Sequence, residues 1–503
     1  MLLFYAILFI IPSLIYGQYE CNVRETEYGR VCVCNSTYCD IVPPLETLLS
    51  GHYQLYSTSK SSPGFSSVTG SFPTESSSSA TVTITVGNVS DTLQTIIGFG
   101  GAFTDSFGIN LLSLPDDVQQ KLLYSYFGQN GIQYNLGRVP IGGTDFSTRP
   151  YTYSDDDLDT FELQSEDYSY KIPVIQKALG FNSNIRLFAS PWSSPASTKT
   201  SNSITISGEL KDEYSQWWAD YHIKFLKAYE ENNITFWGLT TQNEAFDGFL
   251  SVNIPNIKYT AARMVTWIKD FLGPTIRNSS YSDLKIITHD DNRAVLPYLN
   301  WFVLSDDDAL NYIDGIGLHW YSDILIPPSS IEFAKSDKKD LFILGTEACN
   351  GYIRILGIHA VELGSWLRGM NYLNNILDDL SYNVTGWTDW NLALDESGGP
   401  TYIDNNVDAP IIVNSSSGEF YKQPMFYVMG HFSKFVVPDS ARVVSSASND
   451  KVKSMVFKRP DGKIVVTISN ASANDITVEI DIEGVSGVIN IAGHSVNTFL
   501  YKA

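Results

Sequence analysis

The fold is decided by the stretch Phe236-Trp237-Gly238-Leu239-Thr240-Thr241-Gln242-Asn243-Glu244, a short apolar run that ends in polar residues and a carboxylate. The same design recurs in Leu341-Phe342-Ile343-Leu344-Gly345-Thr346-Glu347. Short, continuously apolar runs are typical of strands that are buried on both faces of a parallel sheet. We therefore expect Glu244 and Glu347 to lie at the ends of two such strands.

The middle of the chain alternates short apolar runs with helical patterns. Eight runs can be distinguished, at 95–99, 134–139, 185–189, 235–239, 284–288, 315–319, 341–344 and 384–387. Between them, apolar residues recur near helical spacing, for example at 116–127, 213–231, 259–272 and 361–380. A strand and a helix repeated eight times predict an α/β fold, a (β/α)8 TIM barrel.

Both flanks of this region have strand patterns. After about residue 437 short strands follow one another, and the alternating run 80–86 predicts a half-buried strand near the N-terminus. Residues 57–79, rich in Ser, Gly, Pro and Thr, are interpreted as a long loop within the same β-domain. We expect the tail to pair with the N-terminal region, which gives a discontinuous all-β sandwich domain (46–92 plus 438–503) beside the barrel (93–390 plus 419–437).

The N-terminus and the net charge restrict the compartment and the partners. Residues 1–17 form an apolar segment that ends in small residues, and we interpret them as a secretory signal peptide rather than an anchor. No other run is long enough to span a membrane, so the mature protein is predicted not to be transmembrane. A formal charge of −22 argues against nucleic-acid partners and against spontaneous adhesion to anionic membranes at neutral pH.

The cysteines and sequons agree with passage through the secretory pathway. Cys21, Cys32, Cys34 and Cys39 are clustered, and behind a signal peptide they favour disulfides over a zinc knuckle, with three pairings open. The fifth, Cys349, is interpreted as a packed thiol. Glycosylation sequons occur at Asn35, Asn88, Asn233, Asn278, Asn383, Asn414 and Asn470.

The two glutamates carry the candidate chemistry. Hydrolysis of a glycosidic bond needs one carboxylic acid to protonate the leaving oxygen and one carboxylate to attack the anomeric carbon, about 5 Å apart in a retaining enzyme. In a barrel both would lie at the carboxyl ends of strands, where other polar and aromatic residues also collect: Arg138, Trp192, His319, Tyr321 and Trp390. Arg138 and Asp145 are candidates for a buried ion pair or a sugar-hydroxyl clamp. The pattern contains no metal-binding motif, and no metal or cofactor is predicted.

Several motifs together resemble glycoside hydrolase family 30, the family of the lysosomal acid β-glucosidases (glucosylceramidases). The resemblance extends from Cys21 to the C-terminus. The motifs are the segments 99–105, 138–140, 189–192, 241–244, 319–321, 346–349, 386–394 and 420–427.

The resemblance implies a retaining β-glucosidase with Glu244 as acid/base and Glu347 as nucleophile, which releases glucose from glucosylceramide at acidic pH in the lysosomal lumen. It places Asp145, Trp192, Asn243 and Trp390 in the glucose pocket and Asn405 at its rim, with Arg138, His319 and Tyr321 supporting the carboxylates. It also implies the disulfides Cys21–Cys32 and Cys34–Cys39, in a small disulfide-bonded antiparallel β-domain (18–45 plus 391–418). The implied partners are a saposin-type activator and anionic phospholipid.

One departure from the family concerns the residue after the acid glutamate, which is usually proline and here is Ala245. Residues 245–257 also differ from the vertebrate enzyme, so lipid and activator contacts are not carried over there. Two alternatives stay open: a secreted family member acting on a β-1,6-glucan or another polymeric glycan, and a secreted glycan-binding protein without turnover.

Overall fold

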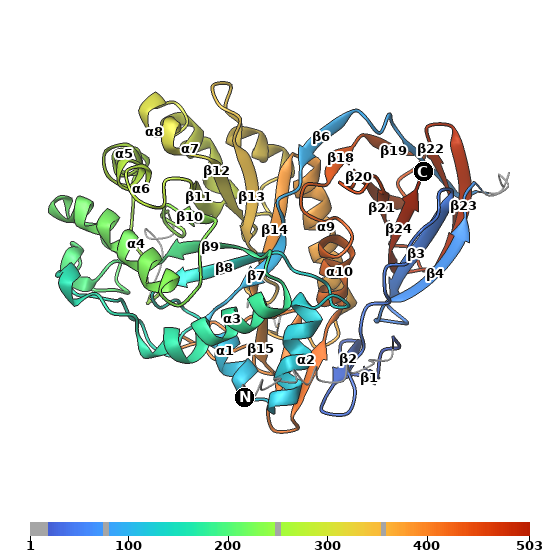
Figure 1. Cartoon of the computed structure of the whole chain (residues 1–503), viewed down its shortest axis with the longest axis horizontal. Helices are drawn as coiled ribbons and strands as arrows, with labels where there is room; N and C mark the ends of the chain where they lie inside the picture. The colour runs from blue at the N-terminus through green and yellow to red at the C-terminus, as the bar shows by residue number, and fades with distance from the viewer. Residues whose placement is uncertain (1–18, 74–79, 247–252, 354–358) are drawn as a thin grey trace, which may run out of the picture.

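The structure is a computed structural model that describes residues 19–73, 80–246, 253–353 and 359–503 (Figure 1). The predicted signal segment, 1–17, lies outside these residues. Among the helices of the described ranges, none is long and apolar enough to cross a membrane.

Eight parallel strands close into a barrel in the order β10-β11-β12-β13-β14-β7-β8-β9. They are β7 (Gly98–Ala102), β8 (Leu136–Ile141), β9 (Arg186–Pro191), β10 (Gly238–Thr240), β11 (Lys285–Asn292), β12 (Gly315–His319), β13 (Phe342–Glu347) and β14 (Val384–Asn391). Each overlaps one of the eight predicted runs, so the TIM barrel is confirmed. The strands are almost wholly buried, because helices cover them on the outside and side chains fill the interior.

Helices connect the strands and form the outer ring of the barrel (Figure 1). They are α1 (Asp105–Leu112), α2 (Asp116–Phe127), α3 (Ile172–Phe181), α4 (Ser215–Glu230), α5 (Ala261–Thr266), α6 (Gly273–Arg277), α7 (Leu296–Phe302), α8 (Asp307–Tyr312), α9 (Trp366–Ser381) and α10 (Pro424–Ser433). The bounds of α2 equal the predicted range, because Pro115 and Gly128 delimit its amphipathic pattern. The connection after β12 carries the short 3-10 helix η8 (Pro328–Ala334).

The β-sandwich combines both ends of the chain, which lie together as blue and red ribbons in Figure 1. One sheet has the order β4-β3-β24-β21-β20-β18-β6 and the other β19-β5-β22-β23. N-terminal strands are β3 (His52–Ser59), β4 (Ser66–Ser71), β5 (Val82–Val86) and β6 (Thr92–Thr95); C-terminal strands are β18 (Ala441–Val443), β19 (Ser445–Ala447), β20 (Val452–Lys458), β21 (Ile464–Asn470), β22 (Ile476–Ile482), β23 (Val485–Ile491) and β24 (Ser495–Lys502).

The prediction of a long loop at 57–79 was wrong for its first part. Strand β3 continues to Ser59, and β4 returns beside it as the second strand of a hairpin. Strand β4 is an edge strand whose residues are exposed or half-buried, and four of its six residues are serine or threonine, so the apolar alternation that marks a strand is absent from the sequence.

The small sheet has the order β1-β2-β17-β16-β15, and the disulfides Cys21–Cys32 and Cys34–Cys39 hold its N-terminal part. Its strands are β1 (Val23–Glu25), β2 (Arg30–Cys34), β15 (Ala393–Asp395), β16 (Ile411–Asn414) and β17 (Glu419–Lys422). Strand β15, which closely follows barrel strand β14 in the chain, is parallel to β16 within the otherwise antiparallel sheet. Strand β17 belongs here rather than to the predicted barrel segment 419–437, since it pairs with β2.

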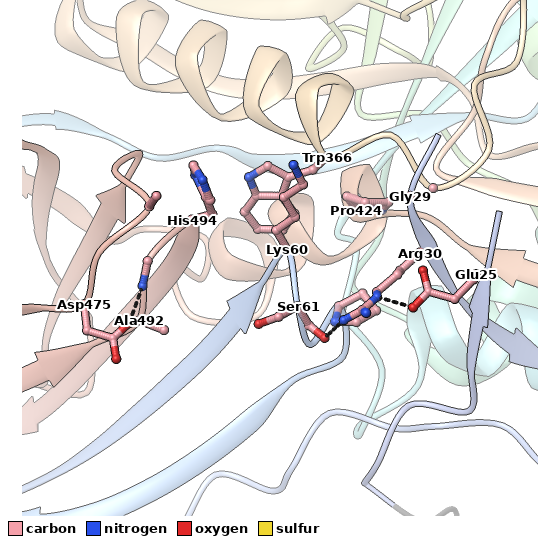
Figure 2. A pocket seen from close by; sticks show the side chains of 14 residues that line it. Glu25, Gly29, Arg30, Lys60, Ser61, Trp366, Pro424, Asp475, Ala492 and His494 are labelled. Carbon is pink, nitrogen blue, oxygen red and sulfur yellow. Dashed lines mark hydrogen bonds and ion pairs between the residues drawn. The ribbon is translucent and has the colours of Figure 1, made fainter. Parts of the chain in front are cut away.

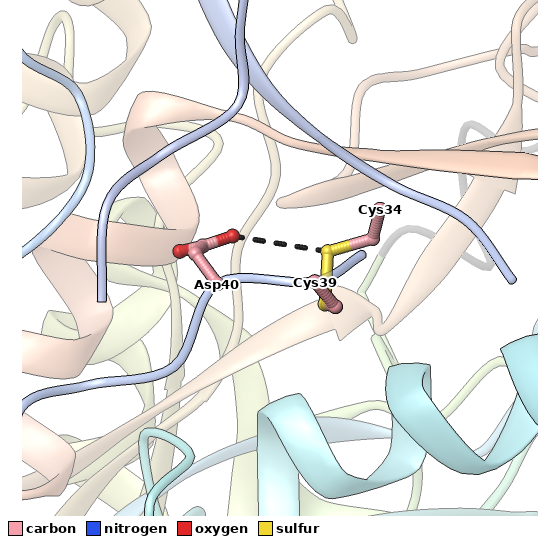
Figure 3. Close-up of side chains that lie close together, drawn as sticks. All are labelled: Cys34, Cys39 and Asp40. Carbon is pink, nitrogen blue, oxygen red and sulfur yellow. Dashed lines mark hydrogen bonds between the residues drawn. A yellow bond between two sulfur atoms is a disulfide. The ribbon is translucent and has the colours of Figure 1, made fainter. Parts of the chain in front are cut away.

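Asp40 anchors the small sheet on the barrel. Its side chain lies beside the Cys34–Cys39 disulfide (Figure 3) and accepts hydrogen bonds from Lys422 Nζ at 3.2 Å and Tyr427 Oη at 2.8 Å. Lys422 lies in β17 and Tyr427 in α10, so one buried carboxylate joins three segments. The sulfur atoms are covalently paired and are not available as zinc ligands.

A groove of about 470 Å³ lies where the small sheet, the sandwich and the barrel meet (Figure 2). Arg30 at its edge donates to Glu25, and Lys60, Trp366 and His494 line it from the other two units. None of the predicted catalytic or substrate-binding residues lines this groove, so it is separate from the candidate site.

Candidate active site

The barrel brings Glu244 and Glu347 together at the carboxyl ends of their strands. Glu347 ends β13, and Glu244 follows β10 after Asn243. One carboxylate oxygen of each glutamate and one ring nitrogen of His319 all lie within 4.8 Å of one another. This separation lies far inside the 10 Å beyond which the two groups could not act on one bond, and it agrees with the spacing of a retaining pair.

The two glutamates differ in exposure. The side chain of Glu244 is 22% exposed and that of Glu347 is 6% exposed. Glu244 also has a positive φ of 43°, a conformation that non-glycine residues adopt mainly where the surrounding structure enforces it. Its backbone N–H donates to the Asp290 carbonyl at 2.9 Å, which holds this turn in place.

Arg138, fully buried in β8, connects the polar residues at the floor of the site. Its guanidinium donates to Glu347 Oε2, to Asn243 Oδ1 at 2.7 Å and to Asp290 Oδ2 at 2.8 Å. Burial opposes the charge, but Asp290 and Glu347 outweigh it and raise the pKa of Arg138. Of the two roles considered for Arg138 with Asp145, the ion pair was wrong, because Arg138 pairs with Asp290 and Glu347 instead; the clamp on sugar hydroxyls stays a prediction.

His319 lies between two carboxylates. Its Nδ1 is 2.9 Å from Glu244 Oε1, and its Nε2 is 3.0 Å from Asp290 Oδ1. Burial opposes the imidazolium, but Glu347, Asp290 and Glu244 raise the pKa of His319 well above its ordinary value. An imidazolium donates from both nitrogens and keeps no lone pair, so this trio of Glu244, His319 and Glu347 is suited to proton chemistry rather than to metal binding.

Tyr321 and Asp145 complete the polar lining. The Tyr321 hydroxyl donates to Glu347 Oε1 at 2.7 Å, so each oxygen of Glu347 has a donor. Asp145 accepts a hydrogen bond from Asn405 Nδ2 at 2.6 Å. Burial raises the pKa of Asp145 to about 7, and Asn405 opposes this shift. Asp145 is therefore largely neutral in mildly acidic solution.

Two indoles form the aromatic part of the site. Trp192 follows β9 and Trp390 lies in β14, and their rings stack with centroids 5.2 Å apart. The Arg138 guanidinium lies 4.8 Å from the Trp192 ring centroid and 5.5 Å from that of Trp390. The structure thus brings together all ten predicted catalytic and substrate-binding residues: Arg138, Asp145, Trp192, Asn243, Glu244, His319, Tyr321, Glu347, Trp390 and Asn405.

Sequence reasoning missed two residues of this network. Asp290 bonds both Arg138 and His319, and Arg138 and His319 hold the pKa of this buried carboxyl below its usual range despite the cost of burial. Gln242 Nε2 donates to the carbonyls of Pro191, Trp192 and Asn243, which fixes two strand ends. In the sequence, Asp290 could have been identified as a candidate from the polar residues that directly follow the apolar run 284–288.

The sequons differ in accessibility. Asn88, Asn233 and Asn278 are exposed, whereas Asn35, Asn383 and Asn414 are half-buried. Asn470 is fully buried, and its amide donates to the carbonyls of Asn474 and Ala492. The folded chain therefore leaves no room for a glycan on Asn470. Ala245, which follows Glu244 where the family usually has proline, is buried, and part of the divergent segment after it lies outside the described residues.

Comparison with known proteins agrees with this geometry. Residues 96–436 match the model of the glycosyl hydrolase family 30 TIM-barrel domain, and residues 439–499 match the family 30 β-sandwich domain. The chain is 39% identical to lysosomal acid glucosylceramidase of Mus musculus, over 98% of each chain. It is 39% identical to putative glucosylceramidase 3 of Caenorhabditis elegans, over 97% of this chain and 96% of the relative. The crystal structure of SrfJ from Salmonella typhimurium superposes with a TM-score of 0.81 at 25% identity, covering 90% of this chain and 100% of the other.

Proposed function

The chain belongs to glycosyl hydrolase family 30 and is a glycoside hydrolase, and on this premise we propose that it hydrolyses glucosylceramide to glucose and ceramide with retention of configuration. The observation that supports the proposal best is the pair Glu244 and Glu347 within 4.8 Å, one partly exposed and one buried. The name of the mouse relative supports the choice of substrate.

In the proposed first step, a carboxylate oxygen of Glu347 attacks the anomeric carbon while the Glu244 carboxyl gives its proton to the leaving ceramide oxygen. The bond from the anomeric carbon to the ceramide oxygen breaks, and a glucosyl ester of Glu347 forms. In the second step, Glu244 takes a proton from water, whose oxygen attacks the same carbon and releases Glu347. The partial exposure of Glu244 fits the group that must meet both the leaving group and water.

The surrounding residues have separate roles in this mechanism. Arg138 and Tyr321 hold the two oxygens of Glu347 in position for attack. Asn243, which accepts from Arg138, presents its amide N–H to the sugar 2-hydroxyl. Trp192 and Trp390 offer apolar surface to the sugar ring, and Asp145 with Asn405 offers hydrogen bonds at the rim.

We place this activity in sphingolipid catabolism in the lysosomal lumen, in line with the compartment named for the mouse relative. There the substrate lies at a membrane surface, and a saposin-type activator and anionic phospholipid are proposed as partners. Acidic pH reduces the negative charge of a chain with formal charge −22 and so favours contact with anionic lipid.

The test is release of glucose from glucosylceramide in vesicles at about pH 5, with and without anionic phospholipid. Glu244→Gln should still form the glucosyl enzyme from substrates with good leaving groups and lose activity on poor ones, whereas Glu347→Gln should lose covalent labelling by a 2-fluoroglucoside. Hydrolysis of a β-1,6-glucan in place of glucosylceramide would favour the secreted polysaccharide hydrolase. Sugar binding without any turnover would favour the glycan-binding protein.

A further inference from the structure

Lys199 is a fully buried lysine whose ammonium has only neutral acceptors. It follows the 3-10 helix η3 (Ala196–Thr198) on the segment after β9. Its Nζ donates to Asn256 O at 2.5 Å, Ile204 O at 3.1 Å, Ile206 O at 3.2 Å and Ser193 Oγ at 3.3 Å. Over the described ranges, no carboxylate lies within ion-pair distance of this nitrogen. A buried cation without a counter-ion is costly, so its position needs an explanation.

The acceptors of Lys199 belong to two segments that lead away from the candidate site. Ser193 directly follows Trp192, and Ile204 and Ile206 lie further along the same segment. Asn256 lies on the segment between Glu244 and α5. Backbone hydrogen bonds also join the two segments, from Asn256 N to Ile204 O at 3.3 Å and from Lys258 N to Gly208 O at 3.0 Å. One ammonium thus ties the segment after Trp192 to the segment after Glu244.

The segment held by Lys199 reaches the wall of the sugar pocket. The Asn256 side-chain amide donates to Ile254 O at 2.6 Å, and Ile254 packs against the apolar cluster that contains Trp192 and Trp390. The neighbouring Asn253 carbonyl accepts a hydrogen bond from Tyr402 Oη at 2.5 Å. Tyr402 lies on the same loop as Asn405, the partner of Asp145. The chain of contacts from Lys199 therefore ends at the cluster of Trp192 and Trp390 and at the loop that carries Asn405.

We infer that Lys199 is a positioning residue of the active site, which joins the segments after β9 and β10 into one wall and so holds Ile254 and Tyr402 where they seat the substrate. This inference deepens the proposed function and rests on it. Lys199 does not touch the reacting atoms and acts through Asn256.

The wall should also depend on pH. Burial lowers the pKa of Lys199 to about 7. An ammonium has three N–H donors for its four acceptors, whereas a neutral amine has two donors and a lone pair that repels carbonyl oxygens. The charged side chains on the segments packed around it are Glu209, Lys211, Asp212, Lys258 and Arg263; of these, Glu209 and Asp212 pair with Arg263, and Lys211 donates to Ser197 O. The wall is therefore complete in acid and loosens as the pH rises through 7.

The effects on stability and on substrate binding have opposite signs. The pKa of Lys199 is depressed in the folded chain relative to about 10.4 in the unfolded chain. Below pH 7 the buried ammonium of Lys199 lowers the free energy of unfolding, and this loss of stability decreases as the pH rises through the window from about 7 to 10. If Lys199 were merely structural, its deprotonation would weaken substrate binding and lower the stability of the fold together. For the role inferred here, deprotonation should weaken substrate binding while the stability of the fold rises.

The experiment compares Lys199→Met with Lys211→Met. Lys211 lies on the same segment, and its Nζ donates to Ser197 O at 2.7 Å. Lys199→Met should raise KM about tenfold for both glucosylceramide and an aryl β-glucoside, with kcat changed less than about threefold. The rise of the wild-type KM near pH 7 should be absent from this variant, and Lys211→Met should behave as wild type. A Lys199→Met enzyme with wild-type KM and pH profile would overturn the inference.

Hydrogen exchange of the wild-type protein keeps the inference testable if Lys199→Met fails to fold. After correction for intrinsic rates, protection of the Asn256 and Lys258 amides should fall between about pH 6 and 8, while amides within α4 stay protected. Unchanged protection of Asn256 and Lys258 would contradict the role of Lys199. If wild type hydrolyses neither substrate, the proposed function fails, and the exchange result still decides the question of Lys199.

Discussion

Arg138 and Asp290 form a fully buried ion pair, with Arg138 Nη2 2.8 Å from Asp290 Oδ2. The second oxygen of Asp290 accepts from His319, and Arg138 also donates to Glu347. The pair therefore lies beneath both candidate catalytic carboxylates: it reaches Glu244 through His319 and Glu347 through Arg138. Because a buried pair is strongly destabilised when one partner is removed, this arrangement links the stability of the barrel floor to the chemistry above it.

Asp290→Asn should lower kcat about 100-fold and the free energy of unfolding by about 3–5 kcal/mol. The amide cannot neutralise Arg138, and His319 loses one of the anions that raise its pKa. The His319 imidazolium that donates to Glu244 Oε1 is then lost at a lower pH, so the alkaline limb of the kcat profile should move to lower pH. Aryl β-glucoside kinetics against pH and urea unfolding measure both effects. Asp314→Asn is the control, because Asp314 pairs with Arg277 at 2.8 Å outside the site. If the alkaline limb of Asp290→Asn were unshifted, Asp290 would not control the pKa of His319.

Asp145→Asn should flatten the pH dependence of stability. The pKa of Asp145 is raised to about 7 in the folded chain, against about 3.9 when unfolded. The folded state therefore binds the extra proton between these values, so the contribution is full below about pH 4 and is lost as the pH rises through 7. The Tm of wild type should fall over this window more than that of Asp145→Asn. Parallel Tm curves for the two proteins would show that Asp145 does not titrate there.

Local sequence patterns predicted the strands of the barrel but not every residue of the candidate site. The range 315–319 of β12 was predicted to the residue, because a strand buried on both faces needs a short apolar run, here 315–318, and His319 marks its polar end. Asp290 was missed because the strand passes through a bulge at this point, where His289 and Asp290 adopt positive φ values of 73° and 50°. Sequence alone indicates a polar loop there. Which acid turns inward is set by Arg138 and His319, which are remote in the chain.

Asp40→Ala should destabilise the attachment of the small sheet by about 3–5 kcal/mol, because it leaves the buried Lys422 ammonium without its carboxylate. Urea unfolding monitored by tyrosine and tryptophan fluorescence measures the change. Asp461→Ala removes a partly exposed carboxylate that pairs with Arg459 and Lys463, and this control should cost less than about 1 kcal/mol. Equal losses in the two variants would show that Asp40 does not act as an anchor.

Tyr321→Phe tests whether the hydroxyl of Tyr321 positions Glu347 for attack. This hydroxyl donates to Glu347 Oε1 at 2.7 Å, while Arg138 holds the other oxygen. Removing one of the two donors should slow covalent labelling by a 2-fluoroglucoside about tenfold, because a donor that fixes a reacting carboxylate contributes on the order of 1–2 kcal/mol. The affinity for glucose should change little, since the oxygen that is lost points to Glu347 rather than to the rim at Asp145.

Tyr352→Phe is the matched control for this experiment. Its hydroxyl donates to the Tyr321 carbonyl at 3.3 Å, and its ring packs against that of Tyr321 with centroids 4.9 Å apart. The control removes the same atom from the neighbouring ring without touching Glu347, so labelling should stay within about twofold of wild type. If Tyr352→Phe slowed labelling as much as Tyr321→Phe, the effect would come from packing of the two rings. A selective loss in Tyr321→Phe would instead place the origin of the effect in the hydrogen bond to Glu347.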